Sequence, residues 1–270
     1  PIKYKAMAEL NYNSFLGTNW NFFQWEDGSN NNERIEQIDQ ETSPDWKAIY
    51  KGILASNSSS AISSNSQRKM VRTDNGIYHV VYESMGNAYY TCSLTSDFSG
   101  EWMKDELLMD YAKNPSIAYA GNEIRIVLEH SPIGYPNETK IMLFEYLPNT
   151  QAQGYVQEEV EDVVFYNVSM FGSAKPVIAF NNGTQYGEIF IAYRKSTSEG
   201  LRQKSKYRNP GTGGNWLWSS ETLISDTDQN SINQSVCSRS GEVHIAFEKL
   251  NSIYYLKGYT QSSNWLFTNF

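Results

Sequence analysis

The sequence predicts an all-β fold built from a repeated antiparallel unit of four strands. Runs of β-branched and aromatic residues alternate with Gly, Asn, Asp and Ser turns along most of the chain. Aromatic residues are frequent, at 14%, while charged residues make up only 19%. The same strand-and-turn pattern then recurs along the 270 residues, which is typical of repeat architectures.

The clearest copy of the unit lies in residues 67–102. Its second strand, over residues 77–82, ends at Glu83, and Trp102 is expected to open its fourth strand. Gly, Asn, Asp and Ser stand where the chain must reverse between these strands. The C-terminal copy repeats this order closely and carries Trp265 in the matching place.

Five copies can be aligned, and their second strands end at Glu26, Glu83, Glu129, Arg194 and Glu248. The units cover residues of about 1–55, 64–110, 111–165, 173–225 and 230–270. Five such units predict a five-bladed β-propeller that forms a single domain over residues 1–270. A six-bladed propeller and an irregular β-sandwich are the alternatives. Residues 4–9 are left over, and we expect them to pair with the last unit and close the ring.

Composition limits the partners and the location. The formal net charge of −8 argues against nucleic acid as a general partner. No apolar run approaches the ~20 residues needed to span a membrane. N-x-S/T sequons start at Asn57, Asn137, Asn167, Asn182 and Asn233. No leader is visible in the chain, and we expect an extracellular or cell-surface protein whose leader has been removed.

The two cysteines, Cys92 and Cys237, fall on different strands of different units. We interpret them as two free, buried thiols, and a long disulfide between them is the alternative. No metal-ligand spacing, phosphate loop or Ser-His-Asp order is recognisable, so the sequence implies no metal and no cofactor.

The ends of the second strands are the candidate site. In a propeller of this type they open onto one face around the central channel, so the four carboxylates and one guanidinium are expected to meet there. Crowded carboxylates raise one another's pKa, which suits an acid and base pair. Glu26, Glu83 and Glu129 are therefore the catalytic candidates, and Arg194 is suited to hold a ligand carboxylate. The alternative is that these side chains bond turn amides and serve the repeat itself.

Residues 194–208 depart from the rest of the chain in charge. They hold six cations and one acid, a net charge of +5 against −13 for the remainder of the chain. A basic patch on an acidic protein can steer an anionic ligand, so an acidic sugar is among the expected partners. The alternative is a solvated outer strand that balances nearby acids such as those of residues 158–162.

An insertion over residues 131–140 follows Glu129. His130 begins it and is the one histidine expected to contact a ligand, and Tyr135 within it is suited to stack on a sugar. By contrast, His79 and His244 share one repeat position and are interpreted as structural. The Trp residues at a fixed repeat position are interpreted as blade-packing residues, and these are Trp46, Trp102, Trp216 and Trp265.

The repeat, with P-S-I-A at 115–118 and H-I-A-F-E at 244–248 followed by a later Trp, resembles the repeats of sialidase-like (BNR-repeat) propellers. The resemblance covers residues 60–270 well and residues 1–60 weakly. It implies a propeller fold and, for many relatives, contact with glycans. The three arginines of true sialidases have no recognisable counterparts in this chain.

We therefore expect a lectin-like propeller that binds carbohydrate without catalysis at the channel face. Its ligand-binding candidates are Glu83, Glu129, His130, Tyr135, Arg194 and Glu248. A glycoside hydrolase with paired channel-face carboxylates is the alternative, in which one Glu is the general acid and another the nucleophile or base. A protein-interaction scaffold is the second alternative.

Overall fold

The protein is represented by a computed structural model. It describes residues 2–13, 19–38, 46–52, 68–84, 86–98, 102–103, 105–120, 123–132, 138–146, 156–164, 174–181, 188–195, 200–208, 216–224, 227–239 and 241–259. Every regular element in these residues is a β-strand. The described part of the chain thus contains no helix that is long and apolar enough to cross a membrane.

The chain divides into two compact units, Pro1–Ser63 and Ser64–Phe270. Organisation as a single domain over residues 1–270 stays a prediction.

The first unit holds two small antiparallel sheets. One pairs β1 (Ile2–Met7) with β4 (Glu33–Ile38), and the other contains β2 (Asn11–Asn13), β3 (Asn19–Trp25) and β5 (Ala48–Gly52). In the described residues β1 pairs with β4 along its whole length, and the pairing of residues 4–9 with the last unit stays a prediction.

Four antiparallel sheets follow one another in the second unit, and each keeps its strands in chain order. Sheet 1 contains β6 (Met70–Arg72), β7 (Tyr78–Ser84), β8 (Asn87–Cys92) and β9 (Glu106–Met109). Sheet 2 contains β10 (Ala112–Ala120), β11 (Glu123–His130), β12 (Glu138–Tyr146) and β13 (Val156–Val164). Sheet 3 contains β14 (Val177–Asn181), β15 (Glu188–Arg194), β16 (Leu201–Arg208), β17 (Trp216–Trp218) and β18 (Thr222–Leu223). Sheet 4 contains β19 (Ser231–Arg239), β20 (Glu242–Lys249) and β21 (Ser252–Tyr259).

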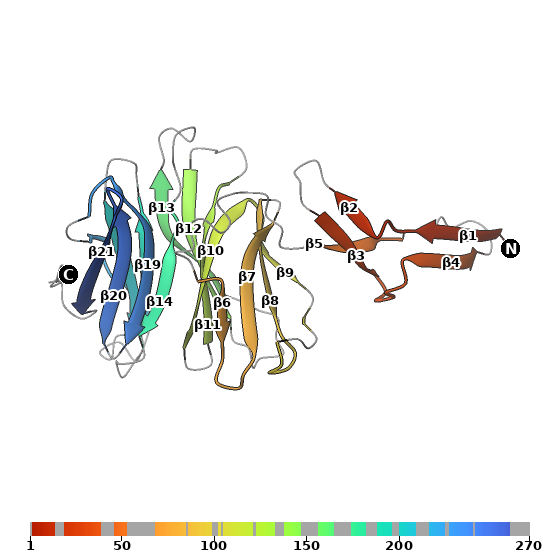
Figure 1. The fold of residues 1–270 in the computed structure, drawn as a ribbon, viewed down its shortest axis with the longest axis horizontal. Helices are drawn as coiled ribbons and strands as arrows, with labels where there is room; N and C mark the ends of the chain where they lie inside the picture. Colours follow the sequence, from red (N-terminus) through yellow and green to blue (C-terminus); the bar gives the residue numbers. More distant parts are fainter. Residues whose placement is uncertain are drawn as a thin grey trace. The chain divides into compact units, whose positions relative to one another are not determined.

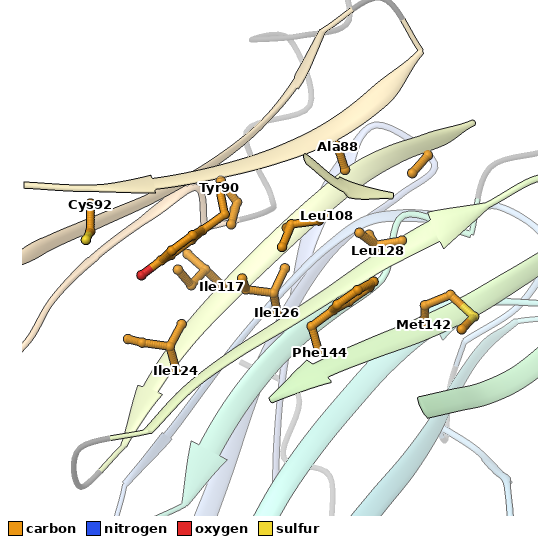
Figure 2. Packing of buried hydrophobic residues seen from close by; sticks show 12 residues of the cluster. Ala88, Tyr90, Cys92, Leu108, Ile117, Ile124, Ile126, Leu128, Met142 and Phe144 are labelled. Atoms are coloured by element: carbon orange, nitrogen blue, oxygen red, sulfur yellow. The ribbon is translucent and has the colours of Figure 1, made fainter. Parts of the chain in front are cut away.

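Apolar residues on both faces of the middle sheets hold this row together. Because side chains alternate along a strand, Ile126 and Leu128 of β11 pack toward sheet 1 while Val127 packs toward sheet 3. Figure 2 shows the layer between sheets 1 and 2, where Tyr90 of β8 lies among aliphatic side chains and near Phe144 of β12. A similar layer joins sheets 3 and 4. Full burial of each such side chain contributes roughly 1.5–3 kcal/mol.

The first strands of successive sheets lie against one another. β10 contacts β6 and, more extensively, its neighbour β7, while β14 contacts both β10 and β19. Figure 1 shows the four sheets side by side in chain order. This is the packing of propeller blades, and it confirms the predicted all-β fold of antiparallel units. The arrangement differs from the irregular β-sandwich that was the alternative, because three separate core layers stack in series. The blade number stays a prediction.

Two details of the repeat differ from expectation. Trp102 forms only an isolated bridge with Ser93, and the fourth strand of sheet 1 begins later, at Glu106. The Trp102 indole instead closes the preceding turn, since its Nε1 donates to the Phe98 carbonyl at 3.2 Å and the two rings meet edge to face. In sheet 3, Trp216 does open β17.

Both cysteines are free thiols. Cys92 is buried as expected, but Cys237 is exposed. The alternation of β19 explains the difference, because its buried neighbour Val236 occupies the face that packs into the core.

Candidate functional site

Four of the five predicted strand-end residues lie at one edge of the second unit. Glu83, Glu129, Arg194 and Glu248 stand at or near the ends of β7, β11, β15 and β20. Antiparallel pairing places these ends beside the beginnings of the first strands of the sheets. The first strands also contact one another, so this edge gathers polar groups from all four sheets.

Near the beginning of the first strands of sheets 2, 3 and 4 lies a residue in the left-handed conformation. These residues are Asn114 (φ 52°), Lys175 (φ 42°) and Asn233 (φ 53°). In sheets 2 and 4 the residue lies in a β-bulge, which turns its side chain toward the strand-end glutamate. Asn114 Nδ2 donates to Glu129 Oε1 at 2.8 Å, and Asn233 Nδ2 donates to Glu248 Oε2 at 2.9 Å. The same Asn–Glu hydrogen bond therefore occurs in two sheets.

Backbone amides of these residues link each sheet to the one before it. The N–H of Asn114 donates to Glu83 Oε2 of sheet 1 at 2.7 Å. The N–H of Lys175 donates to Glu129 Oε1 of sheet 2 at 2.5 Å. Each of these two glutamates thus accepts a hydrogen bond from the first strand of the next sheet.

One more contact completes the connection. Lys175 Nζ donates to Asn233 Oδ1 at 3.1 Å. A continuous hydrogen-bonded series now crosses all four sheets, and we call it the inner-end network. Its members are Glu83, Asn114, Glu129, Lys175, Asn233 and Glu248. Glu129 is fully buried, and the other members are half-buried.

Further polar side chains surround the network. Lys69 Nζ donates to the Pro115 carbonyl at 2.5 Å. Burial lowers the pKa of Lys69 to about 8, although the charges of Glu83 and Glu129 act in the opposite direction. Lys113 Nζ lies 3.7 Å from Glu129 Oε2. Lysine amines and glutamate carboxylates therefore alternate along this edge.

Arg194 stands at the strand-end position of sheet 3 but makes a different contact. Its Nη2 donates to the Gln229 carbonyl at 2.9 Å, and its backbone N–H donates to Ala174 at 2.9 Å. Burial lowers the pKa of the guanidinium. Because arginine only donates hydrogen bonds, it cannot accept one from the next first strand as Glu83 and Glu129 do.

The other predicted residues are not among the members of the inner-end network. Glu26 belongs to the first unit, where it is exposed and lies 3.8 Å from Lys47. His130 Nδ1 is 3.1 Å from the Asp110 carbonyl, and its side chain leaves the strand on the opposite side from Glu129. Tyr135 lies outside the described residues.

The recurrent histidines make equivalent contacts. His79 Nδ1 is 2.7 Å from the Tyr90 hydroxyl, and His244 Nδ1 contacts the Tyr255 hydroxyl in the same way. Both bonds join the second and third strands within one sheet. The structural interpretation of these histidines is confirmed.

The basic residues of β16 face protein groups. Lys206 Nζ lies 2.8 Å from Glu145 of β12, and Lys204 Nζ donates to the Val160 carbonyl of β13 at 2.6 Å. Both amines also lie over the Trp218 ring, at 5.5 and 5.6 Å from its centroid. These lysines therefore join sheets 2 and 3, and Trp216 and Trp218 pack against the same core layer.

Sequence reasoning missed Asn114, Lys175 and Asn233. Each of them stands two or three places before the first apolar core residue of its first strand, in segments that begin Asn-Pro, Lys-Pro and Asn-Gln. Among the described residues, no group of three or more His, Cys, Asp or Glu side chains is placed to hold a metal ion.

No protein-family model matches the chain, and no curated protein matches it in sequence. Solved structures similar to it include an endo-arabinanase from Bacillus licheniformis, 11% identical, with a TM-score of 0.46 over 76% of this chain and 77% of that chain. A variant of the Aleuria aurantia lectin in complex with α-methyl-L-fucoside is 12% identical, with a TM-score of 0.48 over 76% of this chain and 64% of the lectin. A variant of Trypanosoma rangeli sialidase that displays trans-sialidase activity is 11% identical, with a TM-score of 0.41 over 75% of this chain and 37% of the sialidase.

Proposed function

We propose that this chain binds carbohydrate at the inner-end network and does not catalyse a reaction there. Sugar hydroxyls both donate and accept hydrogen bonds, so they need donors and acceptors side by side. The network offers carboxylate oxygens, amide groups and a lysine amine in one half-buried edge. The resemblance of the repeat to sialidase-like propellers, which implies contact with glycans, supports the same proposal.

One observation favours binding over catalysis. Asn114 bridges Glu83 and Glu129, donating to the first through its backbone N–H and to the second through its side chain. Both carboxylates are therefore engaged as acceptors of hydrogen bonds that hold the sheets together. A glycosidase instead needs one carboxyl group that carries a proton and another that faces the sugar, with the bond to be cleaved between them.

Hydrolysis is the second candidate, because Glu83, Glu129 and Glu248 lie on one edge. In that case one half-buried carboxyl group, Glu83 or Glu248, would act as the general acid. Release of reducing sugar from a panel of polysaccharides would favour this candidate and contradict the binding proposal.

A glycan panel probed with the full chain tests the proposal. We expect the wild type to bind at least one glycan, and we expect Glu83→Gln and Glu248→Gln to weaken that binding about tenfold or more. Each change keeps the shape of the side chain but removes its charge and one acceptor. Glu159→Gln, in an exposed ion pair on β13, is the matched control and should bind like the wild type. Equal binding by all four proteins would contradict a site at the network.

We place this binding outside the cell or on its surface, as the sequons suggest. Asn233 is the sequon residue whose side chain is engaged in the network, and a glycan there would displace its bond to Glu248. We therefore expect the secreted protein to carry glycans on other sequons and an unmodified Asn233. Mass spectrometry of protein from the culture medium checks this, and a glycan at Asn233 or retention in the cytoplasm would contradict it.

A further inference from the structure

Sheet 3 departs from its neighbours at two paired positions of the inner edge. Sheets 2 and 4 carry an asparagine in the left-handed position and a glutamate at the strand end. Sheet 3 carries Lys175 and Arg194 in these places. Lys175 therefore stands where sheets 2 and 4 have a neutral side chain, and Arg194 stands where they have an anionic one.

In the part of the chain that the structure describes, neither cation is matched by a carboxylate of its own. Lys175 Nζ donates to the amide oxygen of Asn233, and Arg194 Nη2 donates to the carbonyl of Gln229. Among the described residues, neither side chain forms an ion pair, and Arg194 Nε is buried without a hydrogen-bond acceptor. The Asn233 amide nitrogen donates to Glu248. The side chain of Asn233 therefore stands between this carboxylate and the Lys175 amine.

The arrangement is unfavourable without a counter-charge. Burial lowers the pKa of Lys175, and the positive charge of Arg194 lowers it further, while Glu129 and Glu248 offset part of the effect. Lys175 also adopts a φ of 42°, a conformation that Asn tolerates better than Lys. Gln234, almost fully buried, fixes this strained segment by donating to the carbonyls of Ala174 and Lys175 at 3.1 and 2.5 Å.

We propose that Lys175 and Arg194 form a subsite for an anionic group of a glycan, either the carboxylate of a uronic acid or a sulfate ester. The Arg194 guanidinium has N–H donors beyond the one bonded to the Gln229 carbonyl and can donate to an anion oxygen, and Lys175 adds a second positive charge. This inference rests on the proposed function and specifies its ligand. The chain as a whole carries −8, so binding of a polyanion has to come from a local cationic site rather than from the overall field.

The test compares sodium polygalacturonate, dextran sulfate and neutral dextran as probes in titration calorimetry with the full chain. We expect the wild type to bind the carboxylate or the sulfate polymer and to ignore neutral dextran. The key variant combines Lys175→Asn with Arg194→Glu, which restores the pair found in sheets 2 and 4 and so favours folding. It should bind the anionic polymer at least tenfold more weakly, because two charge-assisted contacts are lost.

Two further variants keep the result interpretable. Arg194→Gln removes the charge with little change of shape, and it should also weaken binding if the double variant fails to fold. Lys140→Asn removes one positive charge from an exposed pair on β12 and should bind like the wild type. Circular dichroism and urea unfolding confirm that each protein is folded.

Each outcome decides between the two proposals. Equal affinity of the wild type and the Arg194→Gln protein, or no binding of either anionic polymer, would overturn the anionic subsite. If neutral glycans of the panel still bind and depend on Glu83 and Glu248, the proposed function stands while the subsite fails. If the anionic polymer binds through Lys175 and Arg194 but Glu83→Gln and Glu248→Gln have no effect, the network proposal fails and the subsite stands.

Discussion

Glu129 accepts hydrogen bonds from Asn114 Nδ2 and from the Lys175 N–H, and it is fully buried. We expect Glu129→Ala to lower the free energy of unfolding by about 3–5 kcal/mol. The reason is that it leaves two donors without their acceptor at the buried position of Glu129 and removes the carboxylate near the partly exposed Lys113 amine. Equilibrium unfolding in urea measures the change.

The control for this change is Glu159→Ala, which removes an exposed carboxylate paired with Lys140 at 2.8 Å. Exposed pairs contribute little, so its effect should stay within about 0.5 kcal/mol. A similar loss in both variants would show that Glu129 has no special part in joining the sheets.

His79 makes stability depend on pH. Burial lowers its pKa to about 4 in the folded chain, below the ordinary value of 6.5. The unfolded chain therefore binds a proton first, and stability present above pH 6.5 is lost as the pH falls toward 4. The loss is on the order of 3 kcal/mol. We expect the difference in unfolding free energy between wild type and His79→Phe to shrink over this window.

Tyr90→Phe is the control, because it removes the 2.7 Å contact to His79 and keeps the burial that causes the shift. Its urea midpoints should follow the slope of the wild type between pH 6.5 and 4. Parallel profiles for wild type and His79→Phe would contradict the role given to this histidine.

At the level of single residues, the sequence predicted part of the site. The repeat predicted Glu83, Glu129 and Glu248, because the same position of each aligned unit lies at the end of the second strand of its sheet. Asn114 and Lys175 did not, because their contribution depends on a left-handed backbone and its N–H, which no side-chain pattern displays. The alternative considered for the glutamates was that they bond turn amides, but Glu83 and Glu129 accept from backbone amides at the start of the next sheet and Glu248 accepts from the Asn233 side chain.

At the level of strands, the sequence pattern likewise does not show which side chains of two sheets will contact each other. The cations of residues 194–208 were predicted to be a ligand patch or a solvated strand, but Lys206 lies against Glu145, 61 residues earlier in the chain. Period-two alternation predicts which face of a strand is buried, and the repeat predicted the sheets themselves. Neither the alternation nor the repeat predicts which charged residue of the next sheet a lysine will contact.

The contact between β12 and β16 gives the prediction at this scale. Glu145 lies 3.4 Å from the buried Arg125 guanidinium and 2.8 Å from Lys206 Nζ. Removing it in Glu145→Ala leaves two buried cations without that carboxylate, so we expect a loss of about 3–5 kcal/mol in the free energy of unfolding.

Lys206→Met tests the same contact from the other side. Its side chain lies over Trp216 and Trp218, and methionine can keep this packing while Glu145 retains Arg125. We expect a loss below about 1.5 kcal/mol in urea unfolding. A greater loss for Lys206→Met than for Glu145→Ala would contradict the assignment of Glu145 as the centre of this contact.

For the whole molecule, the three core layers and the inner-end network lie entirely within residues 64–270. We therefore expect a chain of residues 64–270 to fold alone, because it retains every described contact between the four sheets. Circular dichroism should show β structure, and urea should unfold it in one cooperative transition. Since Glu83, Asn114, Lys175, Arg194 and Glu248 are all retained, it should bind the same glycans as the full chain.

An insoluble or non-cooperative fragment would mean that residues 1–63 complete the fold, as the predicted single domain over residues 1–270 requires. A folded fragment that binds no glycan bound by the full chain would instead place the binding site in the first unit and contradict the site proposed at the network.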